Sequence, residues 1–160
     1  MAELQLVVFR LGREQFAAPI TRVREILRPV RVSRMPRTAS FLRGLFNLRG
    51  QVLPLLDTKA RLGMAPSTGS GQAQSAPVFE GPARDNKARV IVLEAQGENV
   101  GLMVDEVLEV LRCEEQALQA PRTVLDSSAG HFLAAVLDLD GRLVLVLDLD
   151  RLVEGAAEAA

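Results

Sequence analysis

The 160-residue chain is poor in cysteine, histidine and aromatic residues. It contains one cysteine, Cys113, one histidine, His131, and no tryptophan or tyrosine. A single cysteine excludes an internal disulfide and a zinc site built from several thiolates, and it favours a reducing compartment. Aromatic residues make up only 4% of the chain, so few side chains are available to stack on nucleic-acid bases.

Long apolar runs and an excess of charge are also missing. No apolar run approaches the roughly 18–20 residues that span a bilayer, and Arg10 interrupts the apolar N-terminus too early for a signal peptide. The net charge of −1 gives no general attraction to nucleic acid or to an anionic membrane. We therefore expect a soluble, cytoplasmic protein with no nucleic-acid partner and no direct membrane insertion.

A local basic patch stays open as an alternative, because arginines gather in the first third of the chain. A small RNA-binding module would need these arginines on one contiguous face and would bind with a steep salt dependence. They are Arg22, Arg24, Arg28, Arg31, Arg34, Arg37, Arg43 and Arg49.

Two segments of the first half recur in the second half, in the same order. Residues 40–57 align without a gap on 131–148, and residues 13–27 align on 97–111. The longer pair shares six identical positions: Phe41/Phe132, Leu42/Leu133, Leu48/Leu139, Gly50/Gly141, Leu56/Leu147 and Asp57/Asp148. One small unit is used twice, so positions at which the copies differ point to function.

The most informative difference is Arg49, which lies opposite Asp140. Both residues precede a matched glycine, so the turn needs the glycine but not the arginine. An arginine at a hairpin tip is well suited to bidentate contact with a partner carboxylate. A solvated turn charge is an equally good interpretation from the sequence alone.

Val23 and Glu25 recur as Val107 and Glu109. The recurrence favours an architectural role, with the valine in the core and the glutamate on the surface. Alternatively, the pair could form a docking surface together with Ile20.

The hydrophobic pattern predicts an all-β protein. Segments at 21–27 and 105–111 fit either a helical turn or a bent strand, and residues 149–160 should begin as a short helix. Short strands punctuated by glycine favour small barrels over a sandwich or a parallel sheet. Apolar strands are predicted at 4–9, 15–19, 51–56, 89–93, 99–104 and 142–147.

Each half is only about 60 residues long, which is marginal for independent folding. We therefore predict one domain over 1–153 in which two barrels pack as a single cooperative unit. The first barrel should cover about 1–63 and the second about 89–153. Residues 64–88, rich in Ser, Gly, Pro, Ala and Gln, should be a mobile loop, and 154–160 a frayed tail.

The residues that resemble parts of an enzyme site have ordinary structural explanations. Asp138, Asp140, Asp148 and Asp150 could gather around a divalent cation, but aspartates at turns and strand ends are ordinary. No nucleophile-elbow sequence and no glycine-rich phosphate loop is present. We expect no cofactor and no metal. A catalytic arrangement of His131 would have to recruit Ser127, Ser128 or Cys113, and nothing in the sequence places these side chains together.

Four segments together resemble the CheW family of bacterial chemosensory adaptors. They are GREQFAAPITRVREIL, RMPRTASFLRGLFNLRGQVLPLLDTKARLG, NVGLMVDEVLEVL and GRLVLVLDLDRLV. The strongest motif runs from Phe41 to Gly50 and ends in NLRG. The resemblance covers the chain except for the loop at 64–88 and the last few residues.

The resemblance implies two packed SH3-like, five-stranded barrels and no catalysis. It also implies an adaptor that contacts chemoreceptor signalling tips and the regulatory domain of the CheA histidine kinase, at receptor arrays near the inner membrane. Assembly into rings with kinase domains is a further expectation. The family's receptor-binding groove lies between the barrels, and its functional residues match Arg49, Val23 and Glu25. Asn47, Gly50, Gly101 and Val104 are weaker matches that could shape the groove.

Several positions depart from the family's usual pattern. Phe46 stands where a β-branched residue is commoner, and Ala17 where glycine is frequent. Neither change touches Arg49, Val23 or Glu25. The departures are compatible with a specialised pathway, such as one for pilus-based motility.

Overall fold

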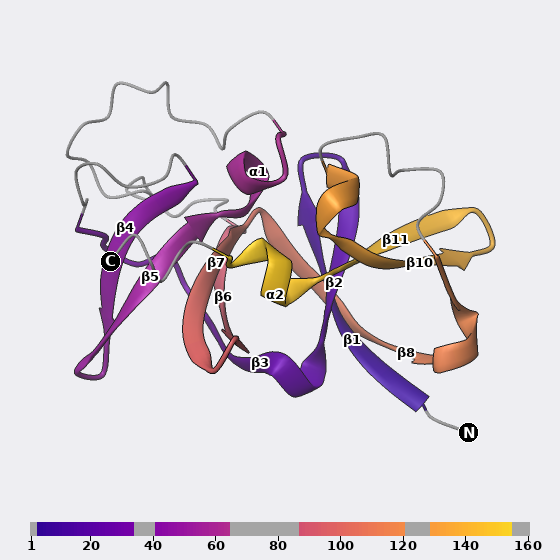
Figure 1. The fold of residues 1–160 in the computed structure, drawn as a ribbon, viewed down its shortest axis with the longest axis horizontal. Coiled ribbons are helices and arrows are strands. Elements are labelled where there is room, and N and C mark those ends of the chain that lie inside the picture. The colour runs from indigo at the N-terminus through magenta and orange to yellow at the C-terminus, as the bar shows by residue number, and fades with distance from the viewer. Residues whose placement is uncertain (1–2, 34–40, 65–86, 121–128, 155–160) are drawn as a thin grey trace.

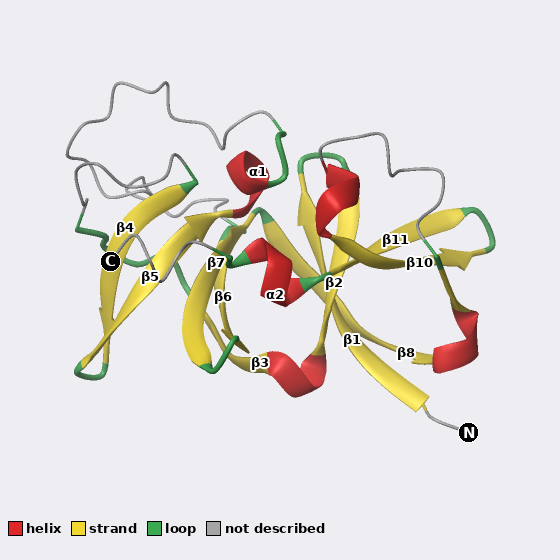
Figure 2. Ribbon diagram, in the orientation of Figure 1, coloured by secondary structure: helices red, strands yellow, loops and turns green. Residues whose placement is uncertain are grey.

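The computed structural model describes residues 3–33, 41–64, 87–120 and 129–154, and these fold mainly into strands (Figures 1 and 2). The helical segments are single turns. They are η1 (Ile20–Arg22), α1 (Thr58–Arg61), η2 (Glu115–Ala117), η4 (Ala129–Phe132) and α2 (Leu149–Leu152). The strands are β1 (Glu3–Leu11), β2 (Glu14–Pro19), β3 (Val23–Leu27), β4 (Leu42–Leu48), β5 (Gln51–Asp57), β6 (Arg89–Ala95), β7 (Glu98–Val104), β8 (Glu106–Glu114), β9 (Leu118–Gln119), β10 (Leu133–Leu139) and β11 (Arg142–Leu147).

Backbone hydrogen bonds divide the strands into two sheets. One has six strands in the order β8-β1-β2-β11-β10-β9, and the other has five in the order β3-β6-β7-β5-β4. Neighbouring strands are antiparallel except for β11 with β2 and β5 with β7. We call the two units the six-stranded barrel and the five-stranded barrel.

Both sheets close on themselves. In the six-stranded barrel, β8 continues through η2 into β9, which pairs with β10 at the opposite edge of the sheet. In the five-stranded barrel, Ser33 bridges to Leu45 through N–O distances of 2.8 and 2.9 Å. Gly44 permits this approach, because a Cβ there would lie 2.2 Å from the Ser33 carbonyl oxygen. If β8 and β9 count as one interrupted strand, each barrel has five strands, so the predicted fold class is confirmed.

The predicted division of the chain between the barrels is wrong. The five-stranded barrel is one continuous stretch, from β3 to β7, while the six-stranded barrel combines β1 and β2 with β8 to β11. Each barrel therefore takes a hairpin from the other repeat: β1–β2 enters the six-stranded barrel and β6–β7 enters the five-stranded one. Local periodicity predicts where strands run but not which strands pair, so the sequence could not reveal this exchange.

The exchange makes the barrels interdependent, because they share their largest apolar core. One hydrophobic cluster contains side chains from strands of both barrels. Its fully buried members include Phe9, Phe16, Leu56, Ile91 and Leu102. Smaller clusters fill each barrel separately. The shared core supports the expectation of one cooperative unit.

The bent-strand alternative for residues 21–27 and 105–111 is the one that forms: residues 23–27 lie in β3 after the η1 turn, and residues 106–111 in β8. The short helix at 149–152 is also confirmed. Most of the predicted loop at 64–88 and of the tail at 154–160 lies outside the described residues. Among the residues that are described, no helix has the length and apolar character needed to cross a bilayer.

Candidate functional site

Arg49 occupies the tip of the β4–β5 hairpin in a conformation that disfavours it. Its φ is 50° and that of Gly50 is 88°, the pair of positive values that defines a type I′ turn. Asp140 and Gly141 adopt φ values of 52° and 95° at the equivalent tip. Asp-Gly is a favoured pair for this turn, whereas a long side chain in the left-handed region costs about 1–2 kcal/mol. Arg49 is therefore not selected by the turn.

The guanidinium of Arg49 forms a bidentate ion pair with Glu25 of β3. Arg49 Nη1 donates to Glu25 Oε1 at 2.9 Å, and Nη2 donates to Oε2. The side chain of Arg49 is 70% exposed and that of Glu25 is 26% exposed. Two residues 24 positions apart in the chain are thus joined at the surface, across the edge strands of the five-stranded barrel.

This pairing shifts the ionisation of both groups. The hydrogen bond from Arg49 is the main reason why the pKa of Glu25 is lowered; burial opposes this shift, and the charge of Arg49 adds to it. The hydrogen bond to Glu25 raises the pKa of Arg49. Since the folded-state pKa of Glu25 is lowered, the pair's contribution to stability is present above the ordinary glutamate pKa and is lost as the pH falls through the folded-state value.

The six-stranded barrel carries a related pair built from a different position. Arg142 Nη2 donates to Glu109 Oε2 at 2.9 Å, and Arg142 Nε donates to Gln15 Oε1 at 2.6 Å. Glu109 is the repeat of Glu25, but Arg142 aligns with Gln51 rather than with Arg49. Sequence reasoning missed Arg142, although its glutamate partner was visible in the repeat.

Val23, Asn47 and Gly50 have clear structural roles beside the pair. Val23 is partly buried and packs against the shared core. Asn47 Oδ1 accepts a 2.9 Å hydrogen bond from the Gly50 amide and so closes the turn that presents Arg49. Asp138 Oδ1 accepts the same bond from Gly141 in the second copy, also at 2.9 Å. Asn47 and Gly50 thus shape the tip.

Gly101 and Val104 lie in the interior. Val104 is 2% exposed, and a Cβ on Gly101 would lie 2.7 Å from Cε1 of Phe46. They influence a partner only through the shape of the fold, unlike the exposed Arg49.

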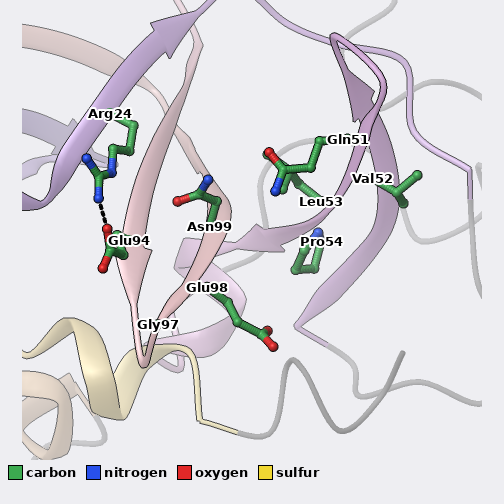
Figure 3. A pocket seen from close by; sticks show the side chains of 9 residues that line it. All are labelled: Arg24, Gln51, Val52, Leu53, Pro54, Glu94, Gly97, Glu98 and Asn99. Carbon is green, nitrogen blue, oxygen red and sulfur yellow. Dashed lines mark ion pairs between the residues drawn. The ribbon is translucent and has the colours of Figure 1, made fainter.

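A hollow of about 510 Å³ lies on the five-stranded barrel (Figure 3). Its lining comes from β3, β5, β6 and β7, and an Arg24–Glu94 ion pair lies at one side. Val52, 59% exposed, lines it together with Gln51 and Glu98.

The residues of the enzyme-like alternatives have other structural roles. The carboxylates of Asp57 and Asp148 cap the short helices α1 and α2, which agrees with the architectural interpretation of the repeated aspartate. Asp150 pairs with Arg22 at 2.6 Å. In the described ranges no group of three or more His, Cys, Asp or Glu could hold a metal ion.

His131 and Cys113 do not assemble a nucleophile. The His131 ring packs edge-on against Phe132, with 5.0 Å between the ring centroids. Burial raises the pKa of the Cys113 thiol, which disfavours the reactive thiolate. Ser127 and Ser128 lie outside the described residues.

The arginines of the first third do not form an open basic face over the described segments. Arg22, Arg24, Arg43 and Arg49 each pair with a carboxylate. Such pairing leaves less charge for phosphates, which removes most of the support for a nucleic-acid interface.

Comparison with known proteins decides the family. The model of the CheW-like domain matches residues 5–157. The chain belongs to the CheW-like domain family. It is 31% identical over 159 residues to the probable chemotaxis protein CheW of Rhizobium etli, covering 98% of this chain and 92% of that protein. It is 30% identical to the chemotaxis protein CheW of Rhizobium meliloti, covering 91% and 84% of the two chains.

A structural match agrees with the family. The crystal structure of the scaffolding protein TtCheW from Thermoanaerobacter tengcongensis superposes with a TM-score of 0.80 and 26% identity, covering 99% of this chain and 98% of that one. The chain is also 33% identical over 99 residues to protein PilI of Pseudomonas aeruginosa, covering 62% of this chain and 47% of PilI. This CheW-family chain is therefore a scaffold adaptor of the chemotaxis type.

Proposed function

We propose that this CheW-family protein couples the cytoplasmic tips of chemoreceptors to the CheA histidine kinase, and that Arg49 and Glu25 contact the receptor. The role is structural: the protein holds the kinase where the receptor state controls it, without catalysing a reaction. It acts in the cytoplasm at receptor arrays near the inner membrane.

The observation that carries the proposal is an arginine held at an exposed hairpin tip whose backbone conformation disfavours it. The second barrel uses Asp140 in the same turn, so the fold has no need of an arginine there. Glu25 orients the guanidinium through two hydrogen bonds. The exposed donors of Arg49 remain available to a partner carboxylate, and the partly buried Val23 precedes Glu25 by two residues in β3.

A receptor hairpin would then lie between the barrels, with apolar contact around Val23 and the Arg49–Glu25 pair at its margin. A barrel surface away from Arg49 docks on the kinase regulatory domain. Repetition of these two contacts would generate a ring containing kinase domains, and the exposed apolar residues Val52 and Leu143 offer further contact area.

The test replaces the tip residue by its counterpart from the other barrel, Arg49→Asp. We expect loss of binding to an isolated receptor signalling tip with an almost unchanged thermal melt, because the turn accepts aspartate. Binding to the CheA regulatory domain should persist. Calorimetry or a pulldown with each partner measures the two interactions separately.

Arg142→Gln is the matched control, because it breaks an Arg–Glu pair of the other barrel and leaves Arg49 intact. This variant should bind the receptor tip as the unmodified protein does. Normal receptor binding by Arg49→Asp would refute the role of Arg49.

A double variant that exchanges the charges, Glu25→Arg with Arg49→Glu, then tests whether the receptor recognises the ion pair as a whole or each charge separately. It restores an internal ion pair of opposite orientation. Recovered receptor binding would mean that the pair docks as a neutral unit, and continued loss would mean that each charge meets an opposite charge on the receptor.

A further inference from the structure

Arg61 joins the two barrels at a point where the repeat symmetry fails. It is the last residue of α1, which follows β5 of the five-stranded barrel. In the ungapped register of the repeats its counterpart is Leu152 of α2, which is fully buried. One copy therefore has an apolar residue and the other a guanidinium at the same place in the fold.

Three hydrogen bonds from Arg61 reach the other barrel. Its Nε donates to the Leu152 carbonyl at 2.9 Å, and its Nη2 donates to the carbonyls of Arg151 and Glu154 at 3.2 and 2.9 Å. The carbonyls of Arg151 and Leu152 lie in the last turn of α2, and that of Glu154 lies two residues beyond it. A cation near the C-terminal end of a helix is favourable for the backbone carbonyls there.

The same guanidinium lies between two equivalent aromatic rings. Its carbon is 4.1 Å from the ring centroid of Phe41 and 4.8 Å from that of Phe132. Phe41 precedes β4 and Phe132 precedes β10, so one ring comes from each barrel. Partial burial at this contact lowers the pKa of Arg61, and the charge of Glu154 acts in the opposite direction.

Within the described segments the chain crosses between the barrels at two places, η1 and Asp105. Each crossing is tied to a helix: Arg22 Nη2 to Asp150 Oδ1 at 2.6 Å, and Lys59 Nζ to Asp105 Oδ2 at 2.8 Å. Two crossings leave rotation about the line between them as the natural relative motion. Arg61 belongs to α1 and donates hydrogen bonds to the end of α2. A rotation of one barrel against the other would break these bonds.

The apolar core shared by the barrels supplies attraction without direction. Hydrogen bonds and contacts to a planar guanidinium have defined directions, so they select one orientation among many that bury similar area. We propose that Arg61 is a positioning residue that fixes the relative orientation of the two barrels by clamping Phe41, Phe132 and the end of α2. Its effect on receptor binding rests on the proposed function, in which the receptor lies between the barrels.

The experiment measures the distance between the barrels by pulsed electron spin resonance. Spin labels are placed at Val52→Cys and Leu143→Cys, equivalent exposed positions on β5 and β11, in a full chain carrying Cys113→Ala. Arg61→Met keeps an extended apolar stem and removes the donors. We expect a broader distance distribution with a shifted mean, and unchanged hydrogen-exchange protection inside each barrel.

Arg61→Lys is measured in parallel, because it keeps the charge but loses the planar fork, and its distribution should lie between the other two. Arg142→Met is the matched control: that arginine binds Glu109 and Gln15 within one barrel, so its removal should leave the distribution unchanged. A folded Arg61→Met or Arg61→Lys protein with the original distribution would overturn the proposal.

Binding of the receptor tip to the same variants separates this inference from the proposed function. A changed distribution with weakened binding supports both. A changed distribution with unaltered binding keeps the clamp and refutes the placement of the receptor between the barrels.

Discussion

In the five-stranded barrel the hairpin tip carries Arg49, and in the six-stranded barrel the same turn carries Asp140. The sign of the charge is also reversed at the junction between the barrels. Lys59 of α1 binds the crossing at Asp105, whereas Asp150 of α2 binds the crossing at Arg22. Equivalent helix positions thus hold equivalent crossings through charges of opposite sign. The duplicated backbone was kept while its charges diverged, which gives one molecule two different surfaces.

The interiors differ in a complementary way. Phe46 of the five-stranded barrel packs against Gly101, while the equivalent pair in the six-stranded barrel is Leu137 and Ala17. A larger side chain faces a smaller one in each case. Phe46 and Ala17, which depart from the family pattern, therefore belong to two separate large–small pairs, one in each barrel.

The largest expected effect on stability comes from the aspartates that cap the short helices, and it should differ between the barrels. Asp57 is 2% exposed, and its Oδ2 accepts from Arg43 Nη2 at 3.0 Å in addition to capping α1. Asp148 caps α2 with a side chain that is 34% exposed. Asp57→Ala should lower the free energy of unfolding by about 2–4 kcal/mol, and Asp148→Ala by about 1 kcal/mol. Equal losses in urea titrations would remove this distinction.

The packing difference should give the next largest effect. Gly101→Ala places a Cβ against the Phe46 ring and should cost about 1–3 kcal/mol. Phe46→Leu in the same chain recreates the pair of the other barrel and should recover much of that loss. Urea unfolding of the single and double variants gives the coupling between the two sites. Additive effects would show that the two positions do not compensate each other.

The hairpin tips provide the smallest effect. Asp140→Arg introduces a long side chain into a left-handed turn. Glu109, the counterpart of Glu25, is already paired with Arg142, so the new arginine should destabilise the protein by up to about 1 kcal/mol. Arg49→Asn suits the turn but loses the ion pair, and the two effects should nearly cancel. Thermal melts of both variants test this asymmetry, and stabilisation by Asp140→Arg would contradict it.

Much of the fold could be read from local signals. The alternation and the glycine turns predicted the strands, and the repeat identified Asp57 and Asp148 as architectural. The exchange of hairpins between repeats could not be read, because pairing depends on contacts between residues far apart in the chain. Arg142 and Arg61 were missed for the same reason: their partners lie 33 and 91 positions away.

The candidate site, too, was predicted in part from the sequence and decided in part by the fold. The mismatch of Arg49 with Asp140 was visible in the sequence. The repeat also raised Val23 and Glu25 as a possible docking surface, and the resemblance implied a functional role for them. Only the folded chain brings Arg49 to Glu25, and only burial separates the exposed tip from the enclosed Gly101 and Val104. Sequence patterns report what each short segment prefers, which was enough for the strands, the turns and the duplicated unit. Which segments become neighbours follows from burying one shared core, and that is a property of the whole chain.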